Sequence, residues 1–162
     1  MKTFMKAAPC SLVFASYASP LGLIHAAMEG PCLVAVSFCA GPEAFEEKLS
    51  QRFGISLSLR KSKAPFTAFF MELDAYFRGR AVEFAVPVKV FGREFDRNVW
   101  KVISAIPRSE VRSYAYVAAE AGRARAYRAV AGACGRNMLP IVIPCHRVIR
   151  SDGSPGGWSG GG

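Results

Sequence analysis

The sequence lacks any long hydrophobic run and is poor in histidine and in acidic residues. None of its apolar stretches approaches the roughly 20 residues that a membrane-spanning helix needs. The 162 residues include 2 histidines, and 12 acidic residues stand against 21 Lys and Arg, which gives a net charge of +9. Because 51% of the residues are hydrophobic, the chain can build a full core, and we expect a compact, soluble protein with no membrane partner.

The cysteines also lack a pattern. There are 5 of them, with no CxxC pair, and an odd number cannot all pair within one chain. The count and the spacing disfavour a disulfide scaffold. Four residues of the first part are candidate zinc ligands: Cys10, His25, Cys32 and Cys39. Their spacing matches no known ligand pattern, so we predict no metal there.

The expected compartment follows from the same cysteines. Reduced thiols favour a cytoplasmic or nuclear protein that is not secreted. Lys2 and Lys6 precede a mildly apolar stretch that imitates a secretion signal, but Pro9 interrupts it early. A strand entering a turn fits this stretch at least as well.

The positive charge lies mostly in the second half. Residues 1–85 carry 9 Lys/Arg against 7 Asp/Glu, while residues 86–162 carry 12 against 5, so +7 of the net +9 belongs to the second part. A basic half indicates a polyanionic partner, most simply nucleic acid. On charge alone, a solvated basic surface without a partner is the alternative.

The first part predicts a small sheet with helices. Strand-like runs over residues 11–17, 21–27 and 31–38 are separated by turn residues, as in an antiparallel meander. Helices are predicted over residues 43–53 and 65–79, the second with an aromatic stripe typical of a core. The alternation of Val82, Phe84 and Val86 predicts another strand before a domain junction near residues 86–92.

The second part predicts mostly helix. The first helix carries its apolar face on Phe95, Val99, Ile103 and Ile106 and ends at Pro107. Ser113 can cap a short helix that stops at Gly122, and another helix covers residues 124–135. Two short helices joined by a tight turn form a helix-turn-helix pattern.

The second of these two helices is unusually rich in small residues. Arg125 and Arg128 are expected on its outer face, and its packed side is expected to consist of Ala126, Ala129, Val130 and Ala133. Small side chains reach base edges poorly, so this helix suits close approach to a groove without reading sequence. Arg128 would then be the long side chain that enters the groove or replaces a base in the stack.

The segment PIVIPCHRVI, residues 140–149, carries the chemistry. The apolar run 141–143 predicts a buried strand, and Pro144 ends its pairing, so Cys145 and His146 would lie at the strand end. Taken alone, Cys145 is typical of an ordinary buried cysteine. The basic helix pair before it and the Gly-rich segment with Trp158 after it favour a reactive thiol beside DNA.

This order of elements resembles the O6-alkylguanine-DNA alkyltransferases, also called methylated-DNA-protein-cysteine methyltransferases. The resemblance rests on FDRNVWKVISAIP, RSYAYVA, YRAVAGACGRN, GRNMLP and PIVIPCHRVI with its downstream SDG, which together cover residues 95–162 almost without a gap. It implies an α+β protein with an N-terminal ribonuclease H-like α/β domain, residues 1–88, and a winged-helix-like (helix-turn-helix) C-terminal domain, residues 89–162.

The resemblance implies DNA repair by direct damage reversal. O6-methylguanine, or another O6-alkylguanine, is flipped out of double-stranded DNA, and its alkyl group passes irreversibly to Cys145. A thioether has no good leaving group, so we expect one turnover per molecule. The resemblance also implies that no cofactor is needed and that the protein is a monomer.

The resemblance also assigns roles to residues. Cys145 is the nucleophile and His146 its base through a bridging water; Tyr114 donates to guanine N3, and Asn137 hydrogen-bonds the backbone of the turn before the cysteine. The DNA-binding residues it implies are Ser113, Tyr114, Ala115, Arg123, Arg125, Arg128 and Ser151. The substrate pocket it implies consists of Val148, Trp158 and Ser159.

The sequence departs from the family pattern in a few places. Ala115 stands where glycine is usual, Tyr127 where a small residue is usual, and Trp158 where tyrosine is commoner. The family glutamate that holds the histidine has no counterpart after Asp152, which leaves open what orients His146.

Two other classes of function stay open at this point. One is a lesion-binding protein of the alkyltransferase-like type, which binds the damage without transfer chemistry, although such relatives lack the active cysteine. The other is a cysteine hydrolase, which needs a histidine opposed to the thiol, and His25 is the only other histidine.

Overall fold

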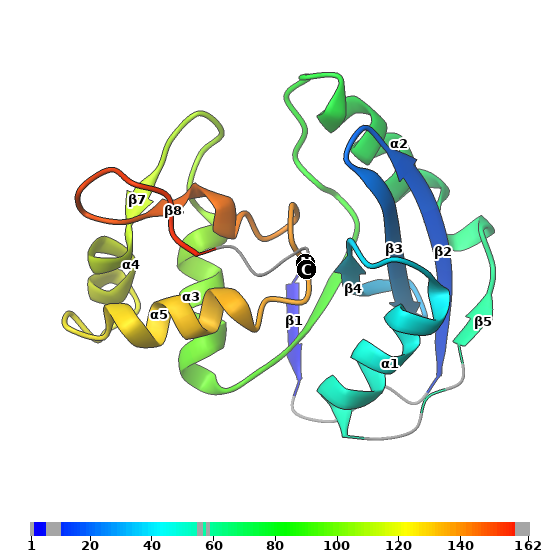
Figure 1. Ribbon diagram of the computed structural model, residues 1–162, viewed down its shortest axis with the longest axis horizontal. Coiled ribbons are helices and arrows are strands. Elements are labelled where there is room, and N and C mark those ends of the chain that lie inside the picture. The colour runs from blue at the N-terminus through cyan, green and yellow to red at the C-terminus, as the bar shows by residue number, and fades with distance from the viewer. Residues whose placement is uncertain (1, 6–10, 55–56, 58, 158–162) are drawn as a thin grey trace. The chain divides into compact units, whose positions relative to one another are not determined.

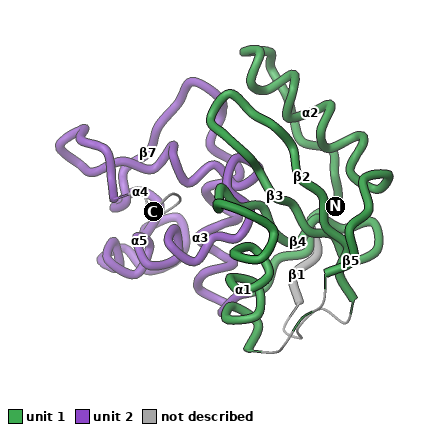
Figure 2. Tube along the Cα trace, turned by 45° about the vertical axis from the view of Figure 1, so that its right-hand side comes forward, with its two compact units in different colours: residues 1–91 green, residues 92–162 purple. Residues whose placement is uncertain are grey.

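The computed structural model describes residues 2–5, 11–54, 57 and 59–157 of the chain. The chain divides into two compact units, residues 1–91 and 92–162 (Figure 2). The division had been expected between residues 88 and 89, but strand β6 (Val88–Phe91) continues to the end of the first unit. No helix among the described residues is long and apolar enough to span a membrane.

The first unit is built on a six-stranded sheet in the order β1-β6-β4-β3-β2-β5 (Figure 1). Its remaining strands are β1 (Lys2–Met5), β2 (Leu12–Ser19), β3 (Gly22–Glu29), β4 (Cys32–Ser37) and β5 (Leu59–Lys61). Strands β2, β3 and β4 are antiparallel neighbours, so the predicted meander is confirmed. The pairs β1–β6, β4–β6 and β2–β5 are parallel.

Two helices cover opposite faces of this sheet. Phe45 of α1 (Pro42–Phe53) stacks on His25, and Phe70 of α2 (Thr67–Phe77) contacts Tyr17, with centroid distances of 5.7 and 5.4 Å. Tyr17 is one residue away from Ser16, which pairs with His25, and successive residues of a strand point to opposite faces. The helices therefore bury the sheet from both sides, with a short 3-10 turn, η1 (Ala64–Phe66), before α2.

Of the strand-like run predicted from residue 81 to Gly92, only Val88–Phe91 forms a strand, β6, and the part from Val82 to Val86 does not. Val82, Phe84 and Val86 alternate with exposed neighbours as predicted, but the segment joins no strand of the sheet. Instead the Ala85 amide donates to Oε1 of Glu72 at 2.9 Å, and the Phe84 ring packs near Phe69. The period of two therefore reflects an extended segment packed on α2, because pattern alone does not supply a strand partner.

The second unit is a group of three helices with a two-stranded sheet. The helices are α3 (Glu94–Ser104), α4 (Tyr114–Glu120) and α5 (Tyr127–Gly135), and β7 (Arg112–Ser113) pairs in parallel with β8 (Val148–Ile149). Ser113 caps α4 as predicted, since its Oγ accepts from the amide of Tyr116 at 3.1 Å. Gly122 ends this helix in the left-handed conformation, with φ 82°.

Trp100 joins two helices in the core of this unit. It is 1% exposed, and its indole Nε1 donates to the carbonyl oxygen of Ala133 at 2.8 Å, which joins α3 to the last turn of α5. Val130 and Ala133 are buried as predicted, but Ala129 is exposed and Ala126 half-buried. The packed side of α5 is thus narrower than expected, and the helix begins at Tyr127, three residues later than predicted.

The strand predicted at residues 141–143 is also wrong. Its residues are buried, but they form a turn in which the Ile143 amide donates to the Leu139 carbonyl at 2.8 Å. Ile141 has φ 74°, in the left-handed region that β-branched residues rarely adopt. The backbone is satisfied locally, so this apolar run needs no strand partner.

Candidate active site

Cys145 is the first residue of a short 3-10 helix, η2 (Cys145–Arg147), directly after the buried turn. Its amide donates to the Ile143 carbonyl at 2.8 Å, and the Arg147 amide donates to the Pro144 carbonyl at 2.9 Å. Arg147 also donates from Nη1 to the Ile106 carbonyl at 2.8 Å, which joins η2 to the loop after α3. The cysteine backbone is therefore held on both sides.

Asn137 organises the turn and holds the sulfur of Cys145. Its side-chain Nδ2 donates to the Ile143 carbonyl at 2.9 Å and to Sγ of Cys145 at 3.1 Å. Its Oδ1 accepts from the Leu139 amide at 2.9 Å. Asn137 thus makes the backbone hydrogen bonds predicted for it and, in addition, one to the thiol.

A second thiol lies against the first. The side chain of Cys134, in the last turn of α5, is a neighbour of the Cys145 side chain. The Cys134 side chain and burial raise the pKa of Cys145, while the side-chain amide of Asn137 acts in the opposite direction. The neighbouring Cys145 thiol favours the ionised form of Cys134 and lowers the pKa of Cys134, so that the pair carries a single charge.

Tyr114 lies beside the two thiols at the beginning of α4. Burial raises the pKa of its phenol, and negative charge on Cys134 and Cys145 acts in the same direction. The hydroxyl therefore keeps its proton at neutral pH and remains a hydrogen-bond donor. A Cβ atom added at Gly156 would collide with this hydroxyl, so the loop after β8 can pass the Tyr114 side chain only with glycine there.

His146 follows the nucleophile candidate but is not among the side-chain partners of Cys145 in the described part of the chain. The residue is exposed, yet the protein around its imidazole removes part of the hydration of the charged form. Desolvation, together with the positive charge of Arg147, lowers the pKa of His146 below 6.5. The ring is therefore neutral at pH 7 and able to accept a proton.

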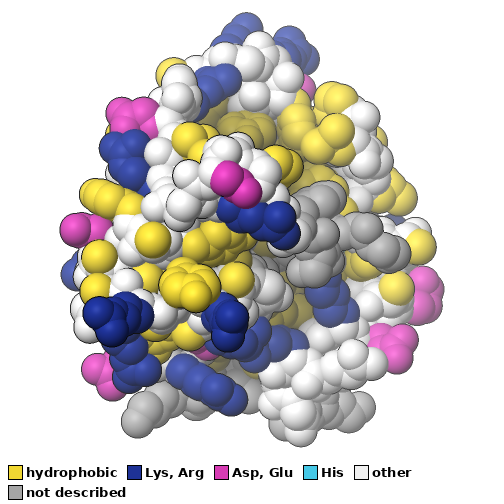
Figure 3. Space-filling view, turned by 60° about the vertical axis from the view of Figure 1, so that its left-hand side comes forward, with side chains coloured by type: hydrophobic (Ala, Val, Ile, Leu, Met, Phe, Trp, Pro, Cys, Tyr) yellow, Lys and Arg dark blue, Asp and Glu magenta, His cyan; other side chains and the backbone are white. Residues whose placement is uncertain are grey.

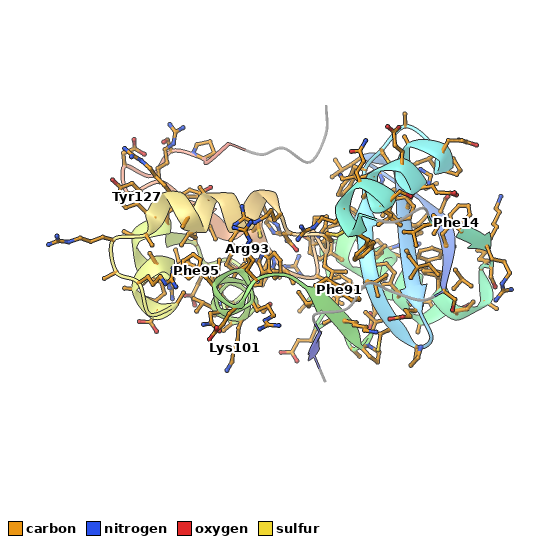
Figure 4. All side chains as sticks on the ribbon, turned by 90° about the horizontal axis from the view of Figure 1, so that it is seen from below. Phe14, Phe91, Arg93, Phe95, Lys101 and Tyr127 are labelled. Atoms are coloured by element: carbon orange, nitrogen blue, oxygen red, sulfur yellow. The ribbon has the colours of Figure 1, made fainter. Side chains whose placement is uncertain are left out.

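The predicted DNA-binding residues lie on α4, α5 and the loops near them. Ala115, Arg123, Arg125, Arg128 and Ser151 are exposed, whereas Ser113 and Tyr114 are half-buried. The Arg123 guanidinium lies 4.9 Å from the centroid of the Phe95 ring, and Arg128 lies 5.9 Å from that of Tyr127. Figure 4 labels Phe95 on α3 and Tyr127 at the start of α5.

The surface around these residues is basic. On the face drawn in Figure 3, Lys and Arg side chains surround an area of hydrophobic side chains, with few acidic ones between them. Tyr116 and Tyr127 are exposed by 45% and 49%. Ala129 and Ala131 are also exposed, so the outer side of α5 offers small side chains beside Arg128.

Of the three predicted pocket residues, the structure describes one. Val148 is 3% exposed and belongs to strand β8, two residues after His146. Trp158 and Ser159 lie outside the described residues. Among the described residues, the structure therefore brings together Cys145, Asn137 and Tyr114.

Three contributors to the site were not predicted. One is Cys134, whose only signal in the sequence is its distance of three residues from Asn137. Another is the ion pair of Asp96 and Arg136, in which Nη2 lies 2.6 Å from Oδ1 and Nε 3.0 Å from Oδ2. The third is Gly156, one of several glycines in a Gly-rich segment. Their roles depend on contacts between elements, which sequence spacing does not reveal.

The histidine of the first unit lies in a different setting. His25 is 1% exposed, its Nδ1 is 2.8 Å from Oγ of Ser16, and its ring stacks on Phe45. It is a core residue of the sheet, which disfavours the cysteine hydrolase. Within the described ranges no three His, Cys, Asp or Glu side chains are grouped as metal ligands, and Cys10 lies outside these ranges.

Comparison with known proteins agrees with this geometry. Residues 12–90 match the ribonuclease-like domain of 6-O-methylguanine DNA methyltransferases, and residues 94–162 match the DNA-binding domain of the same family. A methylated-DNA-protein-cysteine methyltransferase of Methanosarcina barkeri is 36% identical over 143 residues, which cover 88% of this chain and 85% of the relative. The chain belongs to the 6-O-methylguanine DNA methyltransferase family.

Solved structures of this family have the same fold. The O6-methylguanine methyltransferase of Mycobacterium tuberculosis matches with a TM-score of 0.77 and 30% identity over 92% of this chain and 85% of that one. A crystal structure of the M. tuberculosis protein OGT in complex with DNA matches with a TM-score of 0.75 and 31% identity, over 91% and 84%. The predicted family and α+β fold class are thereby confirmed.

Proposed function

We propose that this chain repairs DNA by transferring an alkyl group from O6 of guanine to Cys145, once per molecule. The observation that carries the proposal is the sulfur of Cys145, which is held by Asn137 beside the Tyr114 hydroxyl in the unit that matches the DNA-binding domain of the family. The expected partner is double-stranded DNA containing O6-alkylguanine, met in the cytoplasm or nucleus.

The transfer itself is a displacement at an alkyl carbon. Such a step needs a soft nucleophile, and the thiolate is far more reactive than the thiol. The new S–C bond forms as the C–O bond breaks, and the electron pair of that bond passes to O6 and the guanine ring. The side-chain Nδ2 of Asn137 lies 3.1 Å from Sγ of Cys145 and stabilises the thiolate before it attacks.

Two further side chains accept or donate protons during the transfer. His146, neutral because its pKa is lowered, takes the thiol proton through a bridging water, since it is not a direct side-chain partner of Cys145 in the described structure. The Tyr114 hydroxyl, whose pKa is raised, donates to guanine N3 as negative charge develops on the base.

Residues on α4 and α5 and in the segments beside them bind the DNA. In this proposal Ser113, Ala115, Arg123, Arg125 and Ser151 contact the backbone, and Arg128 fills the gap left by the flipped guanine. The exposed small side chains Ala129 and Ala131 support this assignment, because they let α5 approach a groove closely.

The flipped base enters a pocket beside the thiol. Backbone groups at Cys145 and Val148 would read the amino edge of guanine, and Trp158 and Ser159 would complete the wall. The product is a thioether without a good leaving group, so the alkylated protein is spent and the reaction needs no cofactor.

The test is the mass of the intact protein after mixing with a duplex that contains O6-methylguanine. We expect a gain of one methyl group, mapped to Cys145, with loss of lesion limited to one equivalent of protein. The Cys145→Ser variant should gain no methyl group, while Cys39→Ser, altered in the first unit, should react normally. Retained binding to the lesion without any mass gain in the unaltered chain would indicate a lesion-binding protein instead.

A further inference from the structure

Cys134 and Cys145 form a pair of thiols that the transfer reaction does not use as a pair. Their side chains are neighbours, Asn137 contacts both residues, and both cysteines are partly exposed. Cys32 and Cys39, the other described free cysteines, belong to the first unit, and Cys39 donates from Sγ to the Gly41 carbonyl instead. The second unit therefore presents two adjacent sulfur atoms at the site of the nucleophile.

The fold holds this pair through Asn137. The backbone amide of Asn137 donates to the Cys134 carbonyl at 3.1 Å. The side-chain Nδ2 of the same residue donates to Sγ of Cys145, also at 3.1 Å. On the other side, Trp100 holds the last turn of α5 through the carbonyl of Ala133. One asparagine thus connects the backbone of one cysteine with the sulfur of the other.

We propose that Cys134 is a partner thiol, which forms an intramolecular disulfide with Cys145 when a hydroperoxide such as hydrogen peroxide oxidises the site. The bond itself does not depend on the proposed function. Its consequence for repair does, because a disulfide removes the sulfur that would accept the alkyl group.

The chemistry is a two-step oxidation with hydrogen peroxide as the oxidant. The thiolate of one cysteine attacks a peroxide oxygen, so an S–O bond forms, the O–O bond breaks, and hydroxide leaves to give a sulfenic acid. The second sulfur then attacks the first, the S–S bond forms, the S–O bond breaks, and hydroxide leaves with the proton of the second thiol as water. The two cysteines lose two electrons, and the peroxide is reduced to two molecules of water.

The close contact of the sulfurs decides the fate of the sulfenic acid. A sulfenic acid without a neighbouring thiol goes on to sulfinic acid, which is essentially irreversible. With the second thiol already beside the first, the disulfide forms first, and a dithiol reductant restores both thiols by exchange. A protein that spends itself in one reaction would in this way keep its acceptor thiol through a period of oxidation.

The experiment treats the full chain with hydrogen peroxide in the absence of DNA. The intact mass and the peptides that link Cys134 to Cys145 are then measured, before and after reduction with dithiothreitol. We expect loss of two hydrogens, one linked peptide pair, and loss of methyl transfer that reduction restores. In the Cys134→Ser and Cys134→Ala variants, peroxide should instead add oxygen to Cys145, and the loss of transfer should survive reduction.

Two controls separate this inference from the proposed function. Cys39→Ser should behave like the unaltered chain, because its thiol lies in the first unit. A chain already methylated at Cys145 should form no linked peptide. If the unaltered chain gains oxygen at Cys145 as readily as Cys134→Ser and yields no linked peptide, the inference is overturned, whatever the outcome of the methyl-transfer assay on untreated protein.

Discussion

At the scale of single residues, the site depends on how Asn137, Tyr114 and Gly156 surround the thiol. Asn137 supplies hydrogen bonds to both ends of the turn and to Cys145, so one side chain sets the position of the sulfur. Tyr114 is confined from the other side by the loop at Gly156. The reactive atoms are therefore positioned by neighbours that leave little room for change.

Gly156 provides a direct test of this confinement. A methyl group at Gly156 would overlap the Tyr114 hydroxyl, whereas a methyl group at Gly157 meets no atom of the described residues within 4 Å. We expect Gly156→Ala to slow methyl transfer about tenfold or more, because displacement of a positioned group by about 1 Å is costly. Gly157→Ala is the matched control and should react like the unaltered chain. Equal rates for the two variants in a single-turnover assay would contradict the assignment.

The pH dependence of the transfer rate tests the role of His146 as the base. Its pKa is lowered below 6.5, so the neutral form that accepts a proton persists as the pH falls to that value and is lost only below it. We expect the rate of transfer to a free-base analogue to decline only on the acid side of pH 6.5. In His146→Gln the level part of the profile above pH 6.5 should disappear, and the rate should instead rise about tenfold per pH unit through neutral pH as the thiolate of Cys145 forms by itself. A profile unchanged by the substitution would exclude His146 as the base.

At the scale of elements, the second unit depends on connections between helices that are not neighbours in sequence. Asp96 lies in the first turn of α3, 2% exposed, and forms a two-pronged ion pair with Arg136 at the end of α5. Arg136 immediately precedes Asn137 in the sequence. The ion pair thus fixes the point where the helix gives way to the active-site turn.

Substitution of Asp96 measures how much its ion pair with Arg136 contributes to the free energy of unfolding. We expect Asp96→Ala to lower the free energy of unfolding by about 3 kcal/mol, the lower end for a broken buried pair, since Arg136 can reach water. Asp74→Ala is the control: its ion pair with Arg78 on α2 has side chains 48% and 64% exposed. That substitution should cost about 0.5 kcal/mol. Urea denaturation of both variants checks this, and equal losses would contradict the structural role of Asp96.

At the scale of the whole molecule, the second unit carries most of the charge. Residues 92–162 carry 11 Lys/Arg against 5 Asp/Glu, a net +6, whereas residues 1–91 carry 10 against 7, a net +3. Arg123, Arg125 and Arg128 of the second unit are exposed. Binding to DNA through such a surface releases counterions and therefore weakens as salt is added.

The salt dependence of binding tests which charges take part. We expect Arg125→Ala to reduce the slope of log affinity against log salt by about 1, since one phosphate contact is lost. Arg60→Ala is the control, because Arg60 is exposed on β5 of the first unit and has no expected contact with DNA. A titration of duplex at several salt concentrations gives both slopes. An equal reduction in the two variants would place the DNA contacts elsewhere.

The sequence by itself determined the family and the two-part organisation, and it singled out Cys145 as the proposed nucleophile. PIVIPCHRVI, the capped helix at Ser113 and the aromatic stripe of α2 are local patterns, and local patterns report on their own element. Asn137 was also identified in this way, because the motif that contains it is short and specific.

Only the tertiary structure decided how the site is built. The apolar run before Cys145 is as compatible with a turn as with a strand, and the hydrogen bonds of Asn137 select the turn. The contact of Cys134 with Cys145 joins the end of α5 to η2 across the active-site turn, and the pairing of Asp96 with Arg136 spans 40 residues. Such contacts depend on how elements pack against one another, which hydrophobic period and residue spacing do not specify.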